Sequence, residues 1–228
     1  MRVTMLVATT AVLGLSAGAL GDVLYSNSFE NTDALGGKYY DTGDANVAHD
    51  LVNNAGEAWV DVDGMDAGYI PFDPPGVGLT DGDYVGVTNY TGSVGAFYDG
   101  DQGYQMSDTD GVMSLSSADF AGATSVSLAL FIADTGYEDT DYVQVFFGGV
   151  ELLSIGGTDD GGAALEAAAG SWFEVTGAVA GGALEIYFAS NSGSEALFID
   201  AIVIEGIPAP GALALLAVAG FAGRRRRR

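Results

Sequence analysis

Carboxylates are the most numerous side chains in this chain that could do chemistry. The sequence contains 31 aspartates and glutamates, all between Asp22 and Glu205, and the same stretch holds one lysine, Lys38. Its formal charge is therefore about −30, the 31 acids less the one lysine. A body of this sign attracts divalent cations and repels the phosphates of DNA and RNA. We therefore expect cations among its partners and exclude nucleic acids.

Two acidic segments begin like calcium-binding loops. Residues 61–66 read DVDGMD and residues 108–111 read DTDG. An EF-hand loop needs a bidentate glutamate at its twelfth position. That position is Phe72 for the first segment and Asp119 for the second. Both segments are therefore predicted to be Asp-Gly turns.

Residues for catalysis are few. His49 is the only histidine, so a Ser-His-Asp triad would have to use it, and residues 22–206 contain no Gly-x-Ser-x-Gly elbow. A lyase acting on an acidic sugar would need a cationic side chain, and this region offers only Lys38. A glycoside hydrolase needs a pair of carboxylates, and no spacing selects one here. We predict that the protein is not an enzyme.

Aromatic side chains could bind a ligand, because the apolar face of a sugar ring stacks on Trp and Tyr. Trp59 and Trp172 lie in strand-like contexts, EAWVDV and SWFEV, and are predicted to pack in the core. Tyr137, in DTGYEDTDY, is the aromatic most clearly placed in a loop. The other tyrosines available for stacking are Tyr90, Tyr98 and Tyr104. The ligand-binding residues stay unassigned at this point.

The elements that position these residues are strands, because the apolar period is two. In residues 125–133, valine, leucine and isoleucine alternate with serine, alanine and phenylalanine. Strands are predicted at residues 84–90, 112–116, 125–133, 142–147, 150–155, 183–189 and 196–205. Gly148-Gly149 predicts a hairpin turn, and only residues 163–169 read as a short helix. We expect an all-β fold, a single antiparallel β-sandwich of jelly-roll type over residues 22–206.

The two ends of the chain have a different composition. Arg2 is followed by small and apolar residues up to Leu20, an order typical of a secretory signal peptide at residues 1–21. Near the other end, residues 211–223 carry no polar side chain. A helix of that length rises roughly 20 Å, less than the roughly 30 Å of a hydrocarbon core. An N-terminal signal helix and a C-terminal hydrophobic helix are predicted.

The segment 207–228, IPAPGALALLAVAGFAGRRRRR, resembles the PEP-CTERM sorting signal. The resemblance rests on a Pro-x-Pro motif, a short hydrophobic helix and a terminal arginine cluster. The matching residues are Pro208, Ala209, Pro210, Arg224, Arg225, Arg226, Arg227 and Arg228, with Ala209 where the family name implies glutamate. The resemblance implies transient membrane anchoring, recognition by an exosortase-type enzyme and delivery to the cell surface or extracellular matrix. An ordinary tail anchor is the alternative.

The ends of the predicted sandwich resemble the jelly-roll domains of secreted carbohydrate-binding modules. The residues that carry the resemblance are Phe29-Glu30, after the first strand, and Ile199-Asp200, in the last strand. In that family, acidic residues at these places often hold a structural calcium. The resemblance therefore implies Glu30 and Asp200 as calcium ligands.

Three functions remain open. The first is an exported, exosortase-sorted, non-catalytic protein of the cell surface or matrix. The second is a secreted carbohydrate-binding module with extracellular polysaccharide as its partner, which exposed aromatics on one concave face would favour. The third is a polysaccharide hydrolase or lyase, which a cleft with two facing carboxylates would favour.

Overall fold

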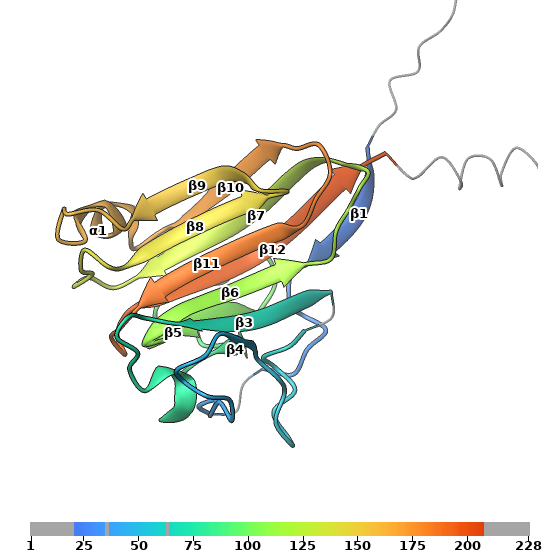
Figure 1. The fold of residues 1–228 in the computed structure, drawn as a ribbon. Coiled ribbons are helices and arrows are strands. Elements are labelled where there is room, and N and C mark those ends of the chain that lie inside the picture. The colour runs from blue at the N-terminus through green and yellow to red at the C-terminus, as the bar shows by residue number, and fades with distance from the viewer. Residues whose placement is uncertain (1–20, 35–36, 63, 208–228) are drawn as a thin grey trace, which may run out of the picture.

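The computed structural model describes residues 21–34, 37–62 and 64–207, which form two antiparallel sheets packed face to face as two layers (Figure 1). The first sheet has the order β10 (Trp172–Ala178), β7 (Ala123–Ala133), β12 (Ala196–Gly206), β5 (Gly103–Ser107) and β4 (Gly86–Thr88), with β1 (Asp22–Asn27) also paired to β12. The second has the order β2 (His49–Asp50), β3 (Met65–Pro71), β6 (Gly111–Ser117), β11 (Leu184–Ser190), β8 (Tyr142–Phe147) and β9 (Val150–Gly156). The predicted all-β antiparallel sandwich is confirmed.

Helices are a minor part of the described chain. They are the 3₁₀ turn η1 (Gly78–Thr80) and the six-residue α1 (Ala163–Ala168). No helix in residues 21–34, 37–62 and 64–207 has the length and apolar character to span a bilayer. The predicted signal helix and C-terminal hydrophobic helix lie outside the described residues, which include only Gly21 and Ile207 of those two segments.

The core lies between the two sheets and follows the period of two. In β7 the inward-facing residues from Val126 to Ile132 are at most 2% exposed. The facing strand β8 alternates in the same way, with Val143, Val145 and Phe147 buried. A side chain of this kind contributes about 1.5–3 kcal/mol when it is fully buried. The alternation therefore fixes which residues of each strand point away from the core.

The outer face of the first sheet is partly covered by the segment between β4 and β5. Val94 and Phe97 from this segment pack with Phe131 and Phe198 in a second apolar cluster, and Trp172 packs against its edge. The indole Nε1 of Trp172 donates a hydrogen bond to the Ala96 carbonyl at 2.8 Å. This cover explains why Phe131, which the alternation places outward, is only 5% exposed.

The hairpin predicted at Gly148-Gly149 is confirmed, and it packs against a second glycine pair. Both residues of the β8–β9 turn have positive φ, 57° and 76°. Gly181 and Gly182, which precede β11, lie directly beside this turn. A Cβ atom on Gly182 would lie 2.3 Å from the Cα of Gly148, and Gly182 itself has a φ of 123°. Only glycine combines this conformation with this approach.

We expect Gly182→Ala to lower the free energy of unfolding by about 2–3 kcal/mol, because strain and a backbone clash add. Gly149→Ala is the matched control, since Gly149 has a φ of 76° but nothing within 4 Å of its added Cβ. Its cost is the left-handed conformation alone, about 1 kcal/mol. Urea denaturation of both variants measures the difference. Equal costs would contradict the proposed packing of the two turns.

Strand β12 contains the irregularity that positions one predicted site residue. Its pairing with β7 shifts register between Asp200 and Val203, and Ala201 has a positive φ of 50°. On the other side, β5 pairs with residues 196–199 of β12 and β1 pairs with residues 202–206. Asp200 therefore lies where β12 changes its neighbour from β5 to β1.

Candidate functional site

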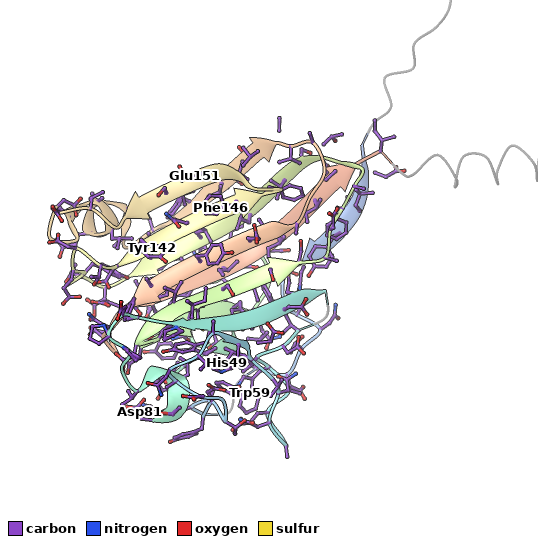
Figure 2. The ribbon with its side chains drawn as sticks, viewed as in Figure 1. His49, Trp59, Asp81, Tyr142, Phe146 and Glu151 are labelled. Atoms are coloured by element: carbon purple, nitrogen blue, oxygen red, sulfur yellow. The ribbon has the colours of Figure 1, made fainter. Side chains whose placement is uncertain are left out.

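The outer face of the second sheet is open in the described part of the chain. In β8, Tyr142, Gln144 and Phe146 alternate with the core residues and are half-buried. Glu185 and Tyr187 do the same in β11. Figure 2 shows Tyr142 and Phe146 along β8 on the side of the sheet that faces the viewer, where no other element of the ribbon lies over them. These side chains contact solvent while their strands are held rigidly by the core.

The strand register arranges these residues in rows across the sheet. One row runs Ser154, Gln144, Tyr187, Ser114 and Gly68, and the next runs Glu151, Phe146, Glu185, Ser116 and Asp66. Adjacent strands lie about 4.8 Å apart, so each row spans about 19 Å. We call these two rows the open face. It is long enough for an extended ligand to cross several strands.

The chemistry of the open face combines aromatic rings with hydrogen-bonding groups. The rings of Phe146 and Tyr187 are 6.1 Å apart at 76°, an edge-to-face contact that holds both in place. The Tyr187 hydroxyl donates to Glu185 Oε1 at 3.3 Å, and burial together with the Glu185 charge raises the pKa of Tyr187. Gln144 Nε2 donates to Ser154 Oγ at 3.4 Å. Rings flanked by hydroxyl, amide and carboxylate groups can stack on a sugar and bind its hydroxyls.

The two predicted calcium ligands, Glu30 and Asp200, bind the same loop. Asp200 Oδ2 accepts a hydrogen bond from the Asp99 backbone at 2.8 Å. Glu30 Oε1 accepts from the backbone N–H groups of Asp101 and Gln102, both at 2.8 Å. The structure thus brings the two carboxylates, distant in sequence, to one loop between β4 and β5.

Backbone N–H groups already donate hydrogen bonds to the carboxylate oxygens of Glu30 and Asp200. Asp200 is fully buried, and its second oxygen accepts from the Ala201 backbone at 2.6 Å. Burial raises the pKa of Asp200 to about 6, although hydrogen bonds from Asp99, Ala201 and Tyr98 act in the opposite direction. These donors hold the loop against the two carboxylates. Calcium at Glu30 and Asp200 stays a prediction, and the Asp200→Asn variant described below tests it.

A separate acidic cluster, which the sequence did not single out, lies at one end of the sandwich. Glu138 and Asp141 come from the β7–β8 connection and Glu195 from the β11–β12 connection. One oxygen of each lies within 4.8 Å of the others, so the cluster could hold a calcium ion. Asp141 and Glu195 are at most 1% exposed. We call these three residues the loop cluster.

Within the described residues, no lysine or arginine compensates the charge of the loop cluster. Lys38, the only lysine or arginine among the described residues, donates to the Gly82 carbonyl and lies over the Tyr84 ring. Burial, followed by the charge of Asp141, raises the pKa of Glu195 to about 7. Burial likewise raises the pKa of Asp141. Both shifts have the direction expected for buried carboxylates that lack a nearby cation.

The single histidine is held in a structural pair. His49 Nε2 lies 2.8 Å from Asp41 Oδ2, and His49 Nδ1 lies 2.6 Å from the Val47 carbonyl. Both ring nitrogens are therefore engaged, and no serine or threonine hydroxyl is among these contacts. This arrangement orients the β2 edge against β3, where the His49 and Tyr69 rings are 5.6 Å apart.

The aromatics selected from the sequence fall into two groups. Tyr137 lies in the loop between β7 and β8, as predicted, but it is only 3% exposed, and its hydroxyl donates to the Ala133 carbonyl. It is not available for stacking, because the β7–β8 connection folds back over its own tyrosine. Tyr104 is fully buried, with its hydroxyl on the Val60 carbonyl at 2.7 Å. Tyr90 and Tyr98 are exposed, at 58% and 45%.

The two tryptophans are packed as predicted. Trp59 lies against the main core and Trp172 against the second apolar cluster. The outward-facing aromatics of β8 were overlooked, although the signal was present. The sequence YVQVFF places Tyr142, Gln144 and Phe146 on the face opposite to Val143, Val145 and Phe147.

Comparison with known proteins gives similarity of fold. No protein-family model and no curated protein matches the sequence. A cleaved adhesin domain of Lys-gingipain from Porphyromonas gingivalis w83 is 11% identical, with 69% of this chain and 100% of that chain covered and a TM-score of 0.41. TmCBM61 in complex with β-1,4-galactotriose is 16% identical, with 57% and 94% covered and a TM-score of 0.36. A CBM36 carbohydrate-binding module with calcium and xylotriose is 17% identical, with 53% and 92% covered and a TM-score of 0.27. None of these similarities assigns a ligand to this chain.

Proposed function

We propose that this protein is an exported, non-catalytic saccharide-binding protein of the cell surface or extracellular matrix, and that the open face binds its ligand. The observation that carries the proposal is the placement of Phe146 and Tyr187 beside hydrogen-bonding side chains on an uncovered, rigid sheet. Neighbouring aromatic rings on an uncovered sheet face are a common feature of ligand-binding surfaces. Sugars fit because their rings have apolar faces and their edges carry hydroxyls.

Neutral polysaccharides are the ligand class that fits the charge. The open face carries Glu151, Glu185 and Asp66 and no lysine or arginine. The body around it has one lysine against 31 acids. Acidic polysaccharides would meet like charge along the whole row, which opposes binding by an amount that grows as salt is removed.

A non-catalytic role fits the surroundings of the histidine and of the open-face carboxylates. Both nitrogens of His49 are occupied by Asp41 and by a backbone carbonyl. Glu185 and Glu151 belong to an open sheet face, on strands separated by β8. A glycosidase needs two carboxylates that flank one glycosidic bond and leave room for the attacking water. A flat face of this kind binds without that arrangement.

Export and sorting form the other part of the proposal. They rest on the sequence alone: the signal peptide at residues 1–21, and Pro208 to Pro210 with Arg224 to Arg228 at the other end. An exosortase-type enzyme is the expected partner, and the membrane is a transient one. A saccharide-binding domain delivered by this route would attach the cell or the matrix to polysaccharide outside it.

A glycan array probed with the purified protein tests the proposed function. We expect binding to neutral polysaccharides and none to uronic-acid or sulfated ones at low salt, because of the charge of the open face. The glycans should remain uncleaved after long incubation with the protein, as judged by assays for new reducing ends. Binding only to acidic glycans, or release of reducing ends, would contradict the proposal.

A further inference from the structure

We propose that the loop cluster, Glu138, Asp141 and Glu195, is a calcium site that ties two loops together at one end of the sandwich. The site is independent of the saccharide-binding proposal, since none of its ligands lies on the open face. It joins residues 134–141, between β7 and β8, to residues 191–195, between β11 and β12. These connections belong to different parts of the sequence and lie at the same end of the fold.

The geometry of the three oxygens suits calcium. Calcium takes oxygen ligands at about 2.3–2.6 Å, so two ligands of one ion lie at most about 5 Å apart. The three carboxylate oxygens of the loop cluster lie within 4.8 Å of one another. Glu138 is exposed, and it leaves a side of the site for the water molecules that complete a coordination shell of six to eight.

An unpartnered oxygen is the second, independent observation. Asp141 is fully buried, and its Oδ2 accepts a hydrogen bond from the Glu138 backbone at 2.6 Å. Its Oδ1 is buried and has no hydrogen-bond partner within the described residues. A buried carboxylate oxygen without a donor is costly. A cation at the loop cluster would supply the missing partner.

The backbone around the cluster is preformed. The Asp141 carbonyl accepts a hydrogen bond from the Gly157 backbone at 2.8 Å, which ties the β7–β8 connection to the segment after β9. Glu195 Oε2 accepts from the Asn191 backbone at 3.3 Å, and Glu195 N donates to the Ser192 carbonyl at 3.1 Å. These contacts hold both loops near the ion position, so that binding requires little rearrangement.

The test is thermal unfolding of the EDTA-treated, full-length protein at neutral pH, with calcium chloride or with sodium chloride of the same ionic strength. We expect calcium to raise Tm by about 5–10 °C at a hundredfold excess over its Kd. Glu195→Gln and Glu138→Gln should lose at least half of that Tm shift. Titration calorimetry should show that each variant binds one calcium fewer per chain than the parent. Asp139→Asn makes the same charge change in the loop of Glu138 but outside the loop cluster. It should keep the Tm shift and the calcium stoichiometry of the parent.

The metal-free variants separate a metal site from a merely structural role. Glu195→Gln removes a buried charge that repels Asp141, so its Tm in EDTA should equal or exceed that of the parent. Glu138→Gln changes an exposed residue, so we expect this variant to fold as the parent does. Asp200→Asn reports separately on the pair predicted from the sequence. A full calcium shift and an unchanged calcium stoichiometry in Glu195→Gln and Glu138→Gln would overturn the proposal, whatever Asp200→Asn does.

Discussion

We expect the double substitution Phe146→Ala with Tyr187→Ala to weaken binding of a neutral polysaccharide about hundredfold. The two rings contact each other at 6.1 Å, and both are half-buried on the open face. Aromatic residues at the centre of a binding surface each contribute about 1.5–3 kcal/mol when truncated, which is roughly 10- to 150-fold in Kd. Two independent losses of this size would multiply to at least about hundredfold. Because the rings are in contact, the losses need not add in free energy, and we expect about hundredfold.

Titration calorimetry of the parent, both single variants and the double variant measures this effect. Tyr90→Ala is the matched control, because Tyr90 is more exposed, at 58%, and lies away from the open face in the segment that follows β4. Its Kd should match that of the parent. The double variant keeps its core, so its Tm should fall by only a few degrees. An equal loss of affinity in Tyr90→Ala would show that the glycan binds exposed aromatic side chains non-specifically and does not bind the open face in particular.

The second large effect concerns Asp83, whose stability contribution depends on pH. Asp83 is 1% exposed, and its Oδ2 is buried without a hydrogen-bond partner among the described residues. Burial raises the pKa of Asp83 to about 8; the charges of Asp108, Asp81 and Asp110 act in the same direction, and Lys38 opposes them. The folded protein therefore holds a proton on Asp83 at neutral pH.

The direction of the pH dependence follows from linkage. The unfolded chain releases the Asp83 proton near pH 4, and the folded chain releases it near pH 8. Stability from this group is fully present below about pH 4 and is lost as the pH rises through about 8. The difference between the two pKa values corresponds to about 5 kcal/mol of unfolding free energy. We expect structural relaxation around the charged Asp83 to reduce this to about 3 kcal/mol.

Asp83→Asn removes this penalty while keeping the shape of the side chain. We expect the variant to be about 3 kcal/mol more stable than the parent near pH 9 and nearly equal to it near pH 4. Urea denaturation across that range measures the difference. Asp81→Asn, which removes a neighbouring exposed charge, should change stability by at most about 0.5 kcal/mol. A stability difference independent of pH would show that Asp83 is not the titrating group.

The sandwich could be predicted because its strands have a clear period of two. The range 142–147 was predicted as a strand and is β8 in the structure, and the predicted turn at Gly148-Gly149 is the β8–β9 hairpin. β3 and β5 were overlooked. In β5, five consecutive residues from Gly103 to Ser107 are buried, so the sequence has no alternation to detect. The segment between β4 and β5 covers its outer face, and only the tertiary structure shows this.

The sites were harder to predict, because they depend on residues brought together from different strands. Glu30 and Asp200 do meet at one loop, which a resemblance to known modules indicated. Glu195 gave no sequence signal, because its partners Glu138 and Asp141 lie more than fifty positions earlier, among many other acids. The burial of Tyr137 was not predicted, since a tyrosine in a polar loop is typically exposed. Its burial depends on the fold of that loop.

Ring-proton NMR of the tyrosines, recorded with and without the neutral glycan that binds most tightly on the array, shows whether the open face binds the glycan. We expect the Tyr187 ring signals to shift on addition of glycan, because Tyr187 lies on the open face. Tyr90 and Tyr98 should stay unchanged. Shifts confined to Tyr98 and to Trp172, whose rings are 6.1 Å apart at the other sheet, would contradict it and move the binding surface there.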